Sequence, residues 1–140
     1  MIIALAVVAL VAFNVALWRR MKTALQARRD WTEADFVESL AQDGCGPRVA
    51  DLVLRLVRPY YHAGVTPHRQ DTFIGFLAIN EEEVEDLVEQ AWRELGLPEP
   101  TTSAPERIPT LETVGDLARY LDRRYRELSR SVDAESVGCN

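Results

Sequence analysis

A dense group of acidic side chains marks the stretch FLAINEEEVEDLVEQAWRELGL, from Phe76 to Leu97. Its acids at the start of an expected helix are Glu81, Glu82, Glu83, Glu85, Asp86 and Glu89. Negative charge in the first helical turn stabilises the helix dipole by about 0.3–1 kcal/mol per residue, which accounts for the first three acids. The later three lie beyond that turn, so they form either a solvated helix face or a docking face for a basic protein. The candidate partner-binding residues are Glu82, Glu85, Asp86 and Glu89.

Histidines, which could serve in catalysis or metal binding, are scarce. His62 and His68 are the only two, and they share one segment without a cysteine or acidic partner at ligand spacing. A structural zinc site needs about four ligands, and a general base needs a nucleophile or substrate within hydrogen-bonding reach. We therefore expect no catalytic residue, no metal site and no cofactor, and we do not expect the chain to be an enzyme.

The two cysteines, Cys45 and Cys139, lack the spacing of metal ligands. Cys45 lies between two glycines, where exposure could leave a reactive thiol, although a plain loop residue is the other interpretation. Only Arg48 and a helix N-terminus lie near enough to lower its pKa. In a reducing compartment we expect both thiols to be free, and a bridge between them is possible only in an oxidising one.

The beginning of the chain has the features of a membrane anchor. The uncharged run from Ile2 to Trp18 would span roughly 26 Å as a helix, near the short limit for crossing a bilayer. Trp18 suits a membrane interface, and Arg19, Arg20 and Lys22 follow it directly. A cleaved signal peptide would have its basic residues before the run and small residues at a cleavage site after it, and neither is present.

These flanking charges predict a single-pass protein of the inner (cytoplasmic) membrane, with residues 1–19 as the anchor and the remaining chain in the cytoplasm. Residues 20–30 form a basic juxtamembrane tether, helical or flexible and without a clear apolar face. The domain over residues 31–130 is acidic, which opposes binding to nucleic acid and to anionic head groups. Residues 131–140 read as a polar tail, frayed from about Ser129.

Capping signals and apolar periodicity predict four helices in this domain. The starts are marked by Thr32 with Asp35, Pro47, Asn80 with Glu83, and Thr113 with Asp116. The apolar faces are Phe36, Val37, Leu40 and Ala41; Val49, Leu52, Val53, Leu56 and Val57; Val84, Leu87, Val88, Ala91, Trp92 and Leu95; and Val114, Leu117, Ala118, Leu121, Tyr125 and Leu128. No stretch alternates as a strand would, so we expect an all-α bundle behind the transmembrane helix.

Two further segments bear on how the bundle packs. The loop over residues 59–79 is apolar, and Phe73, Ile74, Phe76, Leu77 and Ile79 are expected to enter the core. The last helix is basic through Arg119, Arg123, Arg124, Arg126 and Arg130. We expect these arginines to pair within their own helix, as Asp122 and Arg126 can, and with the acidic third helix. A second docking face is the alternative.

The order and spacing of these elements resemble the acyl carrier protein family across about residues 47–125. The resemblance is carried by Asp71-Thr72-Phe73, by Leu77-Ala78-Ile79-Asn80 and by Thr113-Val114-Gly115-Asp116-Leu117. It is closer to carrier-like bacterial proteins in which an acidic run replaces the serine motif, as Asn80 to Glu83 would. The resemblance implies a carrier-like four-helix bundle.

The departure from that family lies at Glu81, which occupies the place of the serine that holds the phosphopantetheine arm. A carboxylate offers no hydroxyl for this modification, so we expect no arm. The resemblance instead implies that the acidic helix docks a protein. The sequence thus predicts a membrane-anchored, carrier-like interaction module with a basic protein partner. The alternative is a genuine acyl or peptidyl carrier, or a subunit of a lipid or polyketide biosynthetic enzyme.

Overall fold

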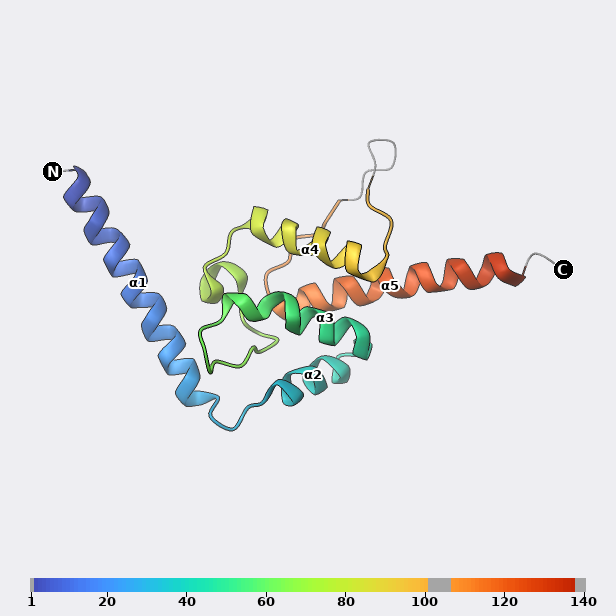
Figure 1. Ribbon diagram of the computed structural model, residues 1–140, viewed down its shortest axis with the longest axis horizontal. Coiled ribbons are helices and arrows are strands. Elements are labelled where there is room, and N and C mark those ends of the chain that lie inside the picture. Colours follow the sequence, from blue (N-terminus) through green and yellow to red (C-terminus); the bar gives the residue numbers. More distant parts are fainter. Residues whose placement is uncertain (1, 101–106, 138–140) are drawn as a thin grey trace.

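A computed structural model describes residues 2–100 and 107–137 of the chain, and over these residues the fold is all-α, as the sequence predicts (Figure 1). The α-helices are α1 (Ile2–Ala27), α2 (Glu33–Gln42), α3 (Pro47–Val57), α4 (Glu81–Leu95) and α5 (Val114–Val137). A 3-10 turn, η1 (Arg58–Tyr60), and a π-helical turn, η2 (Phe73–Leu77), lie between α3 and α4. Strand-like pairing within the described ranges is limited to an isolated antiparallel bridge between Thr72 and Thr113.

The helices of the domain begin where the capping signals place them. In each of three pairs, one side chain accepts from the backbone N–H of the other residue and the bond is returned: Thr32 with Asp35, Asn80 with Glu83, and Thr113 with Asp116. Pro47 opens α3, where a missing N–H costs nothing. Gly96 ends α4 with a φ of 70°, a left-handed conformation that glycine adopts without strain.

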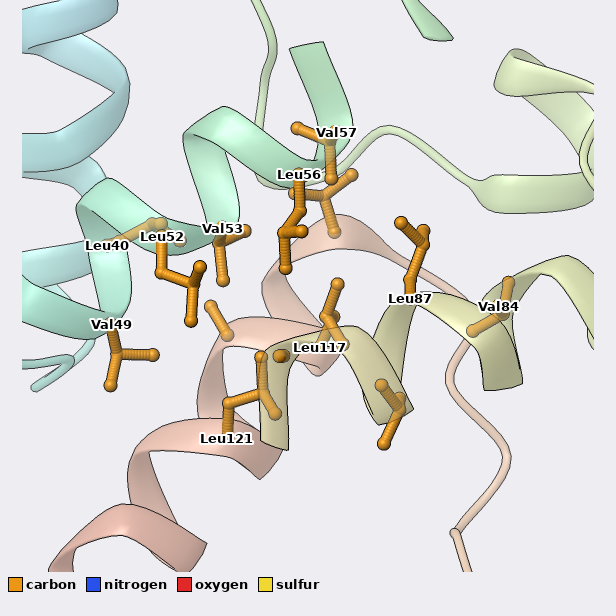
Figure 2. Close-up of a cluster of buried hydrophobic side chains, with 14 of the residues drawn as sticks. Leu40, Val49, Leu52, Val53, Leu56, Val57, Val84, Leu87, Leu117 and Leu121 are labelled. Atoms are coloured by element: carbon orange, nitrogen blue, oxygen red, sulfur yellow. The ribbon is translucent and has the colours of Figure 1, made fainter. Parts of the chain in front are cut away.

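The core forms where α3 packs against α2, α4 and α5. Every residue of the expected apolar faces of α3 and α4 is buried, which confirms those two predictions. Figure 2 shows side chains from three helices meeting at its centre, with Leu117 of α5 lying between Leu56 of α3 and Leu87 of α4. The acidic side of α4 is therefore fixed by the burial of its opposite side.

Some expected core positions are exposed. In α2 it is Ser39, not Ala41, that is buried, and the Ser39 hydroxyl donates to the Phe36 carbonyl at 2.7 Å, which satisfies it within the core. Ile74 is 67% exposed, because the π-helical turn places Phe73 and Leu77 inward and Ile74 outward. Along α5, Val114 to Leu121 follow the prediction, but Tyr125 and Leu128 are only partly buried.

Helix α1 is long and apolar enough to cross a membrane, and its large apolar side chains are exposed along its first four turns. It does not end with the uncharged run. The segment expected as a tether is helical to Ala27, and its Met21 and Ala24 belong to the buried core. Leu17 also packs partly against that core. Spacing of four and three residues puts these three on one face, an apolar face that the sequence analysis missed.

The other end of the chain is also more regular than expected. Helix α5 continues to Val137, whereas the sequence analysis placed fraying from about Ser129. The predicted pair between Asp122 and Arg126 forms, with Nε and Oδ2 at 2.7 Å. Cys139, and with it the question of a bridge to Cys45, lies outside the described residues.

Candidate functional site

The candidate partner-binding residues lie together on the outer side of α4. Glu82, Glu85, Asp86 and Glu89 are all exposed, while Val84, Leu87 and Val88 between them are buried. One helix thus presents four carboxylates to solvent along about two turns. The geometry follows from the local sequence, because a helix that buries positions 84, 87, 88, 91 and 95 must expose the residues between them.

These four carboxylates are unpaired in the part of the chain that the structure describes, since no ion pair or hydrogen bond joins their side chains to another residue there. Some acids elsewhere are paired. Glu94, near the end of the same helix, pairs with Arg55 of α3 at 3.0 Å, and Asp43 pairs with Arg69. The acidic face is therefore distinguished by the grouping of four unpaired carboxylates on one side of one helix, whereas other unpaired acids of the described ranges, such as Glu38 and Asp51, lie apart from one another.

Arg119 and Arg126 of α5 do not neutralise the acidic face. Arg119 pairs with Asp116 and Asp43, and Arg126 pairs with Asp122. The expected pairing between α5 and the acids of α4 is therefore wrong for these arginines. The physical reason is orientation: α4 turns its apolar side toward α5, so its carboxylates point away from that helix.

The negative field of α4 reaches a neighbouring turn. Burial raises the pKa of the Tyr60 hydroxyl, and the charges of Glu83 and Asp86 raise it further. A field of this sign favours cations near α4 and disfavours a second anion.

An open cleft of about 550 Å³ lies at the start of α4. Its apolar lining comes from η2, α4 and the segment before α5: Phe73, Ile74, Val84, Ile108, Pro109 and Leu111. Glu81, Glu85 and Glu112 also line it. Glu81 therefore stands beside the cleft with a carboxylate and no hydroxyl. The sequence analysis did not find this cleft, because its walls come from segments that are far apart in the chain.

Cys45 is buried, which contradicts the interpretation as an exposed, reactive thiol and leaves the other interpretation, a plain loop residue. Burial raises its pKa to about 12, and the neighbouring Asp122 carboxylate acts in the same direction. The thiol is consequently protonated at neutral pH and is a poor nucleophile. Its burial follows from α5, whose Ala118 carbonyl lies 3.9 Å from Sγ.

The histidines are not brought into a metal-binding group: no cluster of three or more His, Cys, Asp or Glu side chains that could hold a metal ion occurs within the described ranges. His68 lies instead beside Trp31, with ring centroids 5.2 Å apart. Burial lowers the pKa of His68, and the nearby Arg28 lowers it further.

A buried polar cluster, which the sequence analysis also missed, joins α1 to the long loop. Asp71 is only 4% exposed, and its carboxylate accepts from the Arg28 guanidinium, from the Tyr61 hydroxyl at 2.6 Å and from the His68 backbone N–H at 2.9 Å. Burial and the Asp71 charge together raise the pKa of Tyr61. The Trp31 indole donates to the Pro67 carbonyl at 2.9 Å beside this cluster.

Three features of the described residues bear on function. The acidic face can attract cations, the cleft can receive an apolar group, and in the Asp71 cluster the carboxylate is buried and hydrogen-bonded. Nothing among them pairs a nucleophile with a base. The chain matches no protein-family model, and neither a curated protein nor a solved structure shows significant similarity to it.

Proposed function

We propose that this chain is a membrane-anchored interaction module that docks a basic protein through Glu82, Glu85, Asp86 and Glu89. The observation that carries the proposal is that these four carboxylates are exposed and unpaired, while Glu94 on the same helix is paired. A basic partner would supply the missing counter-charges, and complementary charge mainly speeds association and selects the partner. The salt dependence of binding should accordingly be strong.

The bundle is proposed to be carrier-like in form without carrying an acyl group. Glu81 occupies the position at the start of α4 where a carrier needs a hydroxyl, and its side chain cannot accept a phosphopantetheine arm. The alternative, a genuine carrier or a biosynthetic subunit, would need its active group at another residue. Binding, rather than an enzymatic activity, is the role assigned here.

The acidic face can be tested by charge reversal. Changing Glu85, Asp86 and Glu89 to Lys should abolish capture of the partner that co-purifies with the wild-type chain, because attraction becomes repulsion. Helical content measured by circular dichroism should hardly change, since exposed substitutions away from caps cost within about 0.5 kcal/mol each.

The matched control reverses three other exposed acids, Glu38, Asp51 and Glu99, which gives the same change in net charge. That variant should retain the partner at low salt. Equal capture by both variants would show that the α4 face is only solvated surface, and equal loss would show that net charge alone decides binding.

The anchor is proposed to lie in the inner membrane with the domain in the cytoplasm. This proposed placement rests on the exposed apolar side chains of α1 and on the basic residues that follow Trp18. Reporter fusions at Asn140 should be active only for a cytoplasmic marker, and full-length chain should sediment with membranes. A soluble product that begins after Trp18 would contradict this prediction.

A further inference from the structure

The inner face of α1 continues from the domain into the uncharged run. Leu17, Met21 and Ala24 contact the core, and Phe13 lies one turn earlier on the same face. Phe13 shares a hollow of about 560 Å³ with Ile74 and with residues 78–82. The η2 turn, yellow-green in Figure 1, lies on the side of the domain that faces α1. Part of the domain therefore lies beside the apolar section of the helix.

Several contacts fix the orientation of α1 relative to the domain. Arg28 is bound to the buried Asp71 carboxylate, and its Nη1 also donates to the Thr66 carbonyl at 2.9 Å. Arg20 donates to the Gly75 carbonyl in η2. Leu25 packs over Gly64, with its Cδ1 3.3 Å from the point where a Cβ would stand. A helix held at Arg20, Leu25 and Arg28 cannot swing away as a flexible tether would.

This attachment sets the depth of η2. Phe13 precedes Trp18 by five residues, so it lies roughly 7.5 Å farther along the helix axis at about 1.5 Å per residue. A bilayer that covers the run from Ile2 to Trp18 must reach the level of Phe13, and there it meets Ile74. Outside α1, Ile74 and Val132 are the large apolar side chains most exposed in the described ranges, at 67% and 57%.

We propose that Ile74 and Phe13 insert into the interfacial layer of the bilayer that holds α1, with Ala78 beside them in the hollow and the buried Ile79 beneath. The occupant of the hollow is lipid, at the depth of the glycerol and upper acyl chain. The domain would then lie on the membrane surface. This inference rests on the proposed membrane anchoring. It shares Glu82 with the acidic docking face, whereas Glu85, Asp86 and Glu89 lie outside the hollow.

The polar residues of the hollow determine how the domain is oriented relative to the bilayer. Glu81 and Glu82 line it as well, and their carboxylates must remain among the head groups. A tilt of α1 toward the domain side would let Ile74 enter the interface while the two carboxylates stay among the head groups. Tilting is a low-cost adjustment of a membrane helix. Zwitterionic head groups, which carry a cationic end, suit these carboxylates better than anionic ones.

The test places a fluorescent label at Ile74 in the full-length chain. Ile74→Cys is made with Cys139→Ser, while Cys45 is left because it is buried, and the protein is reconstituted into phosphatidylcholine vesicles. An environment-sensitive NBD label at position 74 should be quenched by lipids spin-labelled near the glycerol and shielded severalfold from aqueous iodide. Val132→Cys in the same background is the matched control, also an exposed β-branched residue, and its label should show the opposite pattern.

The outcomes separate the two proposals. A chain that fails to float with the vesicles overturns the anchor and this inference together. A chain that floats, with its label at position 74 as accessible to iodide as the label at 132, overturns this inference and leaves the anchor standing. Because Ile74 is exposed, the substitution should leave the circular dichroism spectrum unchanged, so loss of lipid quenching cannot be attributed to misfolding.

Discussion

Replacing Leu117 by alanine should lower the free energy of unfolding by about 2–5 kcal/mol. Leu117 has no exposed surface and lies where α5 faces both α3 and α4 (Figure 2). Its loss leaves a cavity bounded by helices that cannot close on it without moving the other core side chains. Because small domains are stable by only about 5–15 kcal/mol, the variant should be unfolded at denaturant concentrations that the wild type withstands.

Urea unfolding of the full chain in detergent, followed by circular dichroism, measures this change. Val132→Ala is the control on the same helix, where the side chain is 57% exposed and the change should stay within about 0.5 kcal/mol. A similarly small loss for Leu117→Ala would mean that α5 does not pack on the core by this face.

Removing the Asp71 carboxylate should cost about 3–5 kcal/mol, the usual result of breaking a buried ion pair from one side. Asp71→Ala would leave the Arg28 guanidinium, the Tyr61 hydroxyl and the His68 N–H without their shared acceptor. Arg28 is partly exposed and can turn toward water, which places the expected loss at the lower end of that range. Asp71→Asn keeps the shape and should cost less.

The same unfolding measurement tests the cluster, with a surface pair as the control. Asp43 pairs with Arg69 and is far more exposed than Asp71, so Asp43→Ala should cost within about 1 kcal/mol. In a double-mutant cycle, Arg28→Ala should cost much less when Asp71 is already Ala. Additive losses for the two substitutions would contradict the role given to this pair.

The parts of the fold that follow from local sequence could be predicted. The stripe that includes Leu87 and the capping box of Asn80 with Glu83 each depend on residues within a few turns, and the structure bears them out. The exposure of Glu85 and Asp86 follows from the same stripe. Whether these acids bind a protein is not a property of the stripe, so docking remains a prediction.

The features that were missed depend on long-range packing. Asp71 is one of several polar residues in the run from His68 to Thr72, and nothing near it in sequence indicates that Arg28 will meet it. Met21 and Ala24 lie among basic residues, so the sequence around them does not show an apolar stripe. Their burial is evident only from the packing of α1 against the domain. Cys45 between two glycines looks like an exposed loop residue, but α5 covers it from more than seventy residues away.

The continuity of α1 with the domain has a consequence for how a partner finds the acidic face. For a chain anchored as proposed, Arg28 fixes the end of α1 to the domain. This attachment holds α4 at a fixed height above the lipid and in a fixed direction around the α1 axis. A partner confined to the same membrane would search for it in two dimensions, at an effective concentration far above that of a soluble protein. Modest affinity at Glu85 and Asp86 would then suffice for lasting association, and a change in bilayer thickness, by tilting α1, would re-aim the face.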